Sequence, residues 1–107
     1  MQNLKTETIE FLKENGKTVD DVRFIRASGA EIPLDVFWKE ADRNYDDGFG
    51  GAEVNESLMV VGIDWWMERH EYDGSEWWEF KTLPSRPPVA DADADFSRLV
   101  FSDSFFW

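Results

Sequence analysis

The sequence predicts an α+β fold: a small antiparallel sheet of about three strands with two helices on one face, in the order α-β-α-β-β. Two segments repeat apolar residues with the period of a helix, and one segment is rich in β-forming residues. Two further β-rich segments flank an Asp-Gly pair, which is typical of a hairpin turn. We expect a single α+β domain over residues 1–84, followed by a linker and tail over residues 85–107.

The two predicted helices cover residues 4–15 and 33–43. Asn3 can cap the first helix, and Gly16 supplies a left-handed stop. Pro33 opens the second helix. The apolar sides of the two helices are formed by Leu4, Thr8, Phe11 and Leu12, and by Leu34, Phe37, Trp38 and Ala41.

Three strands are predicted, at residues 22–27, 58–70 and 76–83. The last two form a hairpin around Asp73 and Gly74, which favour a two-residue type I′ turn. In that register, residues whose numbers add to 147 lie opposite one another. One face then pairs Trp65 with Thr82, Met67 with Phe80 and Arg69 with Trp78, and we expect it to be the core face. The other pairs Trp66 with Lys81, Glu68 with Glu79 and His70 with Trp77. A three-residue loop with a bulge at Gly74 would shift the register by one residue.

The amino-acid composition changes twice towards the end of the chain. Residues 84–95 contain three prolines and an alternating Ala-Asp run, which is typical of a linker. Residues 96–107 are strongly apolar and aromatic. We expect this tail to dock back on the domain or on another subunit, in which case it would build a homo-oligomer.

Charge is the strongest global signal in these 107 residues. Asp and Glu number 23 against 11 Lys and Arg, which gives a net charge of −12. Direct nucleic-acid binding is disfavoured, because it depends on Lys and Arg displacing phosphate counterions. The acidic residues concentrate between residues 42 and 79, which favours a protein partner with a basic surface, or cations. The alternative is that the acidity serves solubility alone.

The absence of cysteine excludes disulfide frameworks, zinc ribbons and thiol catalysis. The apolar runs are only a few residues long, so we expect neither a membrane span nor an export signal, and the cytoplasm is the expected compartment.

One segment has the spacing of a calcium-binding loop. Oxygen-bearing side chains recur at alternate positions after the second helix, and Glu53 falls on the twelfth position, where an EF-hand places its bidentate carboxylate. Gly48 comes one position later than the motif requires. The candidate ligands of this site are Asp42, Asn44, Asp46, Gly48 and Glu53. The alternative is an acidic, glycine-rich surface loop, and apart from Ca²⁺ no cofactor is expected.

His70 is the only histidine, so a multi-histidine site within one chain is excluded. It could form an acid/base pair with a nearby glutamate, and an opposed Glu68 and Glu79 would repel and raise one pKa. We favour an exposed polar face over a catalytic one, and we do not expect an enzyme. Trp66 and Trp77 would lie together on the open side of the hairpin, where exposed rings can bind a protein partner or stack on a sugar. The candidate partner-binding residues are Trp66, Glu68, His70, Glu71, Asp73, Glu76, Trp77 and Glu79.

Residues 66–81, Trp-Met-Glu-Arg-His-Glu-Tyr-Asp-Gly-Ser-Glu-Trp-Trp-Glu-Phe-Lys, with Asp47-Gly48-x-Gly50 upstream, resemble a segment of small uncharacterised proteins of bacterial phages and mobile elements. The resemblance implies an accessory protein in a bacterial host and brings no activity or site residues. Small acidic proteins of such elements include inhibitors that imitate DNA charge. We therefore expect a non-enzymatic acidic interaction module that occupies a basic, nucleic-acid-binding surface of a host protein.

Overall fold

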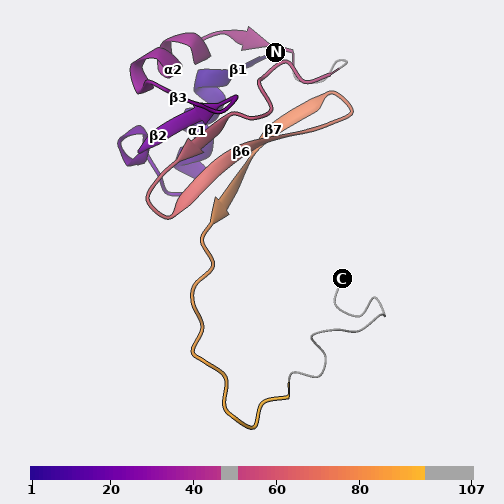
Figure 1. Ribbon diagram of the computed structural model, residues 1–107. Helices are drawn as coiled ribbons and strands as arrows, with labels where there is room; N and C mark the ends of the chain where they lie inside the picture. The colour runs from indigo at the N-terminus through magenta and orange to yellow at the C-terminus, as the bar shows by residue number, and fades with distance from the viewer. Residues whose placement is uncertain (47–50, 96–107) are drawn as a thin grey trace.

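The computed structural model describes residues 1–46 and 51–95 (Figure 1). Two helices lie against a five-stranded antiparallel sheet, and a short second sheet joins the N-terminus to the end of the second helix. The elements are β1 (Gln2–Asn3), α1 (Leu4–Glu14), the 3-10 helix η1 (Val19–Asp21), β2 (Phe24–Ala27), β3 (Ala30–Ile32), α2 (Leu34–Ala41), β4 (Asn44–Tyr45), β5 (Met59–Val61), β6 (Trp65–Tyr72) and β7 (Ser75–Thr82). After β7, residues 84–95 are exposed and contain no helix or strand.

The two helices lie where local signals place them. The Asn3 side chain accepts a hydrogen bond from the Thr6 N–H at 3.0 Å, which satisfies one of the free donors at the start of α1. Gly16 follows α1 with a φ of 73°, the left-handed conformation that glycine adopts at low cost. Phe37 and Ala41 bury the inner side of α2. Both predicted helices are confirmed.

The prediction of about three strands is wrong, because the large sheet has five strands within the described residues, in the order β3-β2-β5-β6-β7. After the turn at Ser28 and Gly29, residues 30–32 pair with β2 as the additional strand β3, and α2 begins after Pro33. The expected long strand at 58–70 is divided at Gly62 into β5 and β6. A Cβ at Gly62 would lie 2.1 Å from the Trp65 ring, so the chain folds back on itself there and only glycine fits.

The hairpin register is confirmed. β6 and β7 pair from Trp65 opposite Thr82 to Tyr72 opposite Ser75. Asp73 and Gly74 have φ values of 53° and 86°, the positive angles that a type I′ turn requires at both central residues. Because side chains alternate along a strand, this register decides which residues share a face of the sheet.

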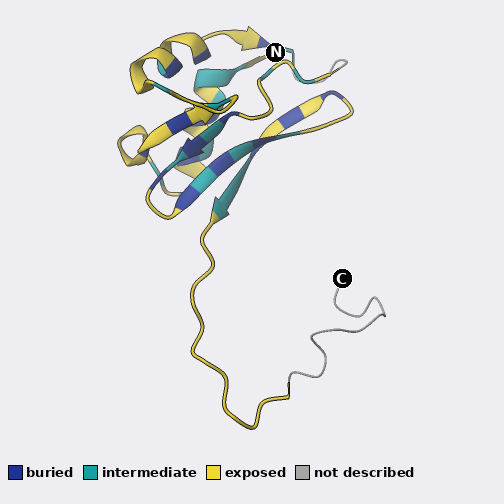
Figure 2. Ribbon diagram, in the orientation of Figure 1, coloured by how far each residue is buried: buried dark blue, intermediate teal, exposed yellow. Residues whose placement is uncertain are grey.

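The core lies between the helices and one face of the large sheet. Ile25, Val60 and Met67 occupy one row across β2, β5 and β6 and are fully buried, and Leu12 of α1 is fully buried in the same cluster. Figure 2 shows buried residues alternating with partly exposed ones along β6. Within the described residues, no helix is long and apolar enough to cross a membrane.

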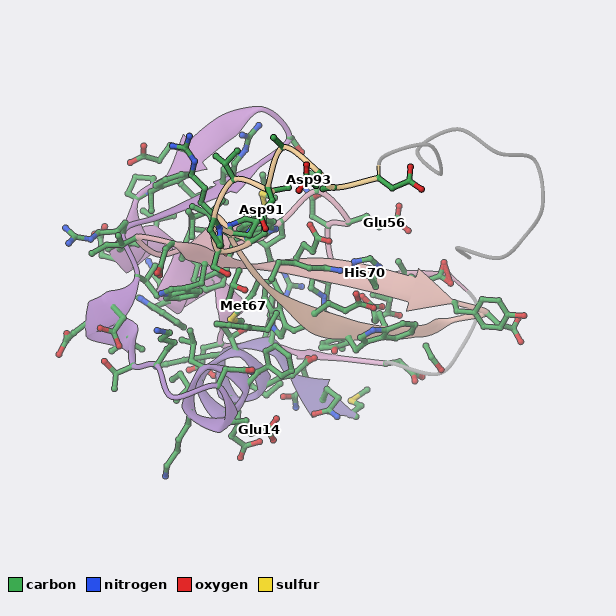
Figure 3. The ribbon with its side chains drawn as sticks, turned by 90° about the horizontal axis from the view of Figure 1, so that it is seen from below. Glu14, Glu56, Met67, His70, Asp91 and Asp93 are labelled. Carbon is green, nitrogen blue, oxygen red and sulfur yellow. The ribbon has the colours of Figure 1, made fainter. Side chains whose placement is uncertain are left out.

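The opposite face of the sheet carries no helix in the described part of the chain, and we call it the open face (Figure 1). In Figure 3, Met67 lies on the side of β6 that faces α1, whereas His70 lies on the other side of the strand. The domain therefore buries one side of its sheet and leaves the other accessible.

Candidate functional site

The open face of the hairpin brings together five of the candidate partner-binding residues. These five residues, Trp66, Glu68, His70, Trp77 and Glu79, share one side of β6 and β7 with Lys81. Trp77 is 37% exposed, and the side chains of Glu68, His70, Glu79 and Lys81 are between 30% and 42% exposed. The site is a partly exposed surface of aromatic and charged groups.

Each tryptophan on this face is held by a carboxylate two residues further along its own strand. The Trp66 Nε1–H donates to Glu68 Oε2 at 3.2 Å, and the Trp77 Nε1–H donates to Glu79 Oε2 at 3.1 Å. The His70 ring lies nearly parallel to the Trp77 ring, with centroids 6.4 Å apart. These contacts restrict the two indoles before any partner arrives, which lowers the entropy lost on binding.

The two strands present this surface with an approximate local two-fold symmetry. Residues 66–70 read Trp-x-Glu-x-His and residues 77–81 read Trp-x-Glu-x-Lys. Because Glu68 lies directly opposite Glu79 in the antiparallel pair, a two-fold axis between them relates the two triplets. The indoles therefore lie at diagonal corners of the surface, with the two carboxylates between them.

The two glutamates are partly neutralised by their neighbours. His70 Nε2 lies 3.1 Å from Glu68 Oε1 and 3.5 Å from Glu79 Oε1. Lys81 Nζ lies 3.3 Å from Glu79 Oε1 and 4.0 Å from Glu68 Oε1. The hydrogen bond with His70 is the main cause that lowers the pKa of Glu68, and the hydrogen bond from Trp77 is the main cause that lowers the pKa of Glu79. The expectation that one pKa would be raised is wrong, because these donors and cations outweigh the repulsion between the carboxylates.

A hollow of about 470 Å³ opens beside His70 on this face. The hollow lies next to the start of β5, where residues 56–58 precede the strand and do not fill the space between β2 and β6. Its walls include Arg26, Glu56, Ser57, Met59, Glu68 and His70. Arg26, Glu56 and Met59 are not among the site residues that the sequence predicts. Arg26 and Met59 reach the site only because β2 pairs with β5 and β5 pairs with β6, contacts that no local pattern indicates.

The structure separates the other three candidate partner-binding residues from this surface. Glu71 and Asp73 are exposed at the hairpin turn, where Glu71 Oε2 accepts a hydrogen bond from the Gly74 N–H at 3.0 Å. Glu76 is 6% exposed and lies on the core face. Its carboxylate accepts hydrogen bonds from the N–H groups of Glu53 and Val54, at 2.7 and 3.0 Å. Glu76 therefore connects β7 to the backbone of residues 53–54, and its charge does not face solvent.

Glu76 belongs to a buried cluster around Arg69. The Arg69 guanidinium donates to Glu7 at 2.9 Å, to Tyr45 Oη at 3.1 Å and to Glu76 at 3.4 Å, and it lies 5.0 Å from the centre of the Trp78 ring. Burial by itself would lower the pKa of Arg69, but the hydrogen bond with Tyr45 and the charge of Glu7 raise it. Burial and the hydrogen bond that Tyr45 donates to Glu7 raise the pKa of the phenol. The guanidinium therefore stays charged and the phenol neutral, and the cluster ties α1, β4, β6 and β7 together.

The proposed calcium ligands lie in a segment whose oxygens already accept hydrogen bonds. The Asn3 amide donates to Asp42 Oδ1 at 3.1 Å and to Asn44 Oδ1 at 3.2 Å, while Glu53 Oε2 accepts from the Asp46 N–H at 2.9 Å. Gly48 lies outside the described residues. Over residues 1–46 and 51–95, no three His, Cys, Asp or Glu side chains are grouped so that they could hold a metal ion. Calcium binding by this loop stays a prediction.

No family model, curated protein or solved structure matches this chain. The chemistry of the open face is therefore the guide to the function of this chain.

Proposed function

We propose that this chain is a non-enzymatic interaction module whose open face binds a protein partner with a basic surface. The observation that carries the proposal is the pair of partly exposed indoles, Trp66 and Trp77, each held in place by a carboxylate. Tryptophan is among the residues that dominate binding energy at protein interfaces. Its ring also attracts the guanidinium of arginine, so that a partner rich in arginine has a direct contact on this face.

The charge around the face supports the same partner. Glu68 and Glu79 are already paired with Lys81 and His70, so the long-range attraction comes mainly from the surrounding acidic side chains and from the net charge of −12. Glu56, Glu71 and Asp73 are exposed around the hairpin. Such a field speeds association with a basic protein and repels nucleic acid itself.

These properties fit a protein that occupies the nucleic-acid-binding surface of a host protein. The exposed acidic side chains around the hairpin would take the place of the phosphate charges of a nucleic acid. The indoles would stack on the partner's arginines, as nucleic-acid bases do. The resemblance of residues 66–81 to proteins of phages and mobile elements agrees with this role. A host enzyme that acts on DNA is the kind of partner we propose.

The test compares a double variant, Trp66→Ala with Trp77→Ala, with a matched apolar control. Val36→Ala removes a 43% exposed side chain from α2, which packs on the other side of the sheet, and should change nothing. The probe is an arginine-rich peptide, with an aspartate-rich peptide of equal length as the negative probe, followed by isothermal titration. We expect the double variant to weaken binding at least about tenfold.

The same titration at rising salt concentration separates charge from other attraction. We expect the affinity of the wild-type chain for the arginine-rich peptide to fall steadily with salt. Equal binding by the double variant and the wild type, or an affinity that salt does not change, would contradict the proposal. The partner itself would then be identified by capture from bacterial lysate and by competition with DNA.

A further inference from the structure

β7 is an edge of the large sheet, and its outer side has no strand partner in the described part of the chain. It runs for eight residues, Ser75–Thr82, in unbroken register with β6 and contains neither proline nor a bulge. A long, regular edge is a ready template for a further strand, and proteins normally block or use it.

The positions of the hydrogen bonds determine which β7 residues have free backbone groups. The Leu83 N–H donates to the Asp64 carbonyl at 3.1 Å, which continues the β6–β7 register by one residue. Hydrogen-bonded positions recur at every second residue of an antiparallel pair. The odd-numbered residues of β7 therefore bond to β6, and the even-numbered residues direct their N–H and C=O groups outward. These outward residues are Glu76, Trp78, Phe80 and Thr82.

We propose that β7 pairs antiparallel with β7 of a second copy of this chain, with Phe80 opposite the partner's Phe80. In this register the outward groups of Trp78 meet those of the partner's Thr82, and each such pair exchanges two hydrogen bonds. On the open face, Glu79 lies opposite the partner's Lys81, and Lys81 lies opposite the partner's Glu79. Cross-strand pairs of opposite charge are stabilising.

Neighbouring registers lose this charge complementarity. Other registers can also place the outward backbone groups of the two β7 strands opposite one another. The register centred on Glu79 places Glu79 opposite the partner's Glu79. The opposite shift, centred on Lys81, sets the two lysines against each other, and like charges directly opposite are destabilising. A register centred on Trp78 sets Trp77 opposite the partner's Glu79 and leaves Lys81 without an acidic partner. Among these registers, the one centred on Phe80 alone pairs opposite charges.

The dimer has a consequence for binding that rests on the proposed function. Its two-fold axis is perpendicular to the sheet, so the two open faces lie on the same side of one continuous sheet. Both Trp66 and Trp77 pairs would then face one partner together, and two weak contacts would combine into a much stronger attachment.

The first test measures the mass of the full chain by light scattering after size exclusion, over a range of protein concentration. Thr82→Pro removes an outward N–H without removing a hydrogen bond to β6, whereas the matched control Thr82→Ala keeps that N–H. We expect the wild type and Thr82→Ala to be dimers, and Thr82→Pro to dissociate at least about tenfold more readily. Circular dichroism establishes that all three variants are folded.

The second test exchanges the charges. Lys81→Glu sets acidic side chains against each other across the interface and should give a monomer, whereas the double variant Glu79→Lys with Lys81→Glu restores the pairs and should restore the dimer. A wild-type chain that is monomeric at every concentration overturns the proposal. A dimer that survives both Thr82→Pro and Lys81→Glu also overturns it, because another surface, such as residues 96–107, must then hold the copies together.

Salt separates a failure of this inference from a failure of the proposed function. Each copy has a charge of −12, so the copies repel and added salt should strengthen the dimer. Binding to the arginine-rich peptide should weaken with salt. If the chain is a monomer that still binds the peptide through Trp66 and Trp77, the proposed dimer is wrong and the proposed function stands. If the chain is a dimer that does not bind the peptide, the proposed function is wrong and the dimer stands.

Discussion

Both faces of the β6–β7 hairpin hold a cation between two carboxylates, but the two clusters differ in their exposure to water. On the core face, the exposed fractions of the side chains are 2% for Arg69, 17% for Glu7 and 2% for Glu76. On the open face they are 42% for Lys81, 30% for Glu68 and 36% for Glu79. The same charge pattern therefore occurs twice: the core-face cluster is almost completely shielded from water, and the open-face cluster is partly exposed to it.

This difference separates structural from binding roles. Removal of one partner from a buried ion pair leaves a charge without water or a counterion, which is costly. An exposed pair contributes little to folding, since water can replace either partner. The core-face cluster is therefore committed to holding four elements together, and the open-face cluster is free to exchange its contacts for those of a partner.

The largest expected effect is that of Arg69→Met. Methionine fills part of the space of the guanidinium, but it leaves the carboxylates of Glu7 and Glu76 without their cation. We expect the free energy of unfolding to fall by about 3–5 kcal/mol, measured by urea denaturation.

Lys81→Met is the matched control, because it removes the cation between the two open-face glutamates. We expect the free energy of unfolding to change by less than about 1 kcal/mol. Equal losses for the two methionine variants would mean that burial does not distinguish the two clusters.

An intermediate effect is expected for Trp78→Phe. Trp78 is 3% exposed, and its Nε1–H donates to the Thr8 hydroxyl of α1 at 3.0 Å. The substitution leaves that hydroxyl without its donor and opens a small cavity, so we expect a loss of about 1–3 kcal/mol. Trp77→Phe makes the same chemical change on the open face and should cost less than about 0.5 kcal/mol in thermal or urea unfolding. A reversed order of the two variants would refute the assignment of the two faces.

The smallest effect is a dependence on acid pH. The pKa values of Glu68 and Glu79 lie below the usual 4.5 in the folded chain, first because of the hydrogen bonds with His70 and Trp77 respectively. A lowered folded-state pKa stabilises the protein above the unfolded value, and this contribution disappears as the pH falls through the folded-state pKa. Between neutral pH and pH 4.5 the contribution should be constant, and below pH 4.5 it should decline.

The measurement compares thermal melting of the wild type with that of the double variant Glu68→Gln with Glu79→Gln, at a series of pH values. The difference in melting temperature should narrow as the pH falls below 4.5. The shift should be smaller than for either core substitution, because both carboxyl groups are partly exposed to water. A difference that stays constant down to acid pH would show that these hydrogen bonds do not favour the charged carboxylates.

The features that were predictable from the sequence depend on short-range chemistry. The Asp73-Gly74 pair determines a turn within four residues, and that turn sets the register of every residue in β6 and β7. The grouping of Trp66 and His70 with Trp77 follows from the register alone. The helices were equally predictable from the sequence, since Asn3, Gly16 and the apolar spacing act within one or two helical turns.

The sheet beyond the hairpin was not predictable in this way. β3 and β5 are three residues each, too short for a periodic pattern, and they are stabilised by pairing with β2. Glu76 is a candidate partner-binding residue in the sequence, although the alternation along the hairpin puts it on the same side of β7 as Trp78. Its burial depends on Arg69 and on the backbone of residues 53–54, and no local rule indicates that contact.

Short-range preferences in the chain were thus enough to specify two helices, one hairpin and the alternation that divides its side chains between two faces. Tertiary packing decided which charges are removed from water, because Glu7 reaches Arg69 across 62 residues and Tyr45 reaches it across 24. The energy of a charge depends on the dielectric and on the partners around it, and these are properties of the assembled fold.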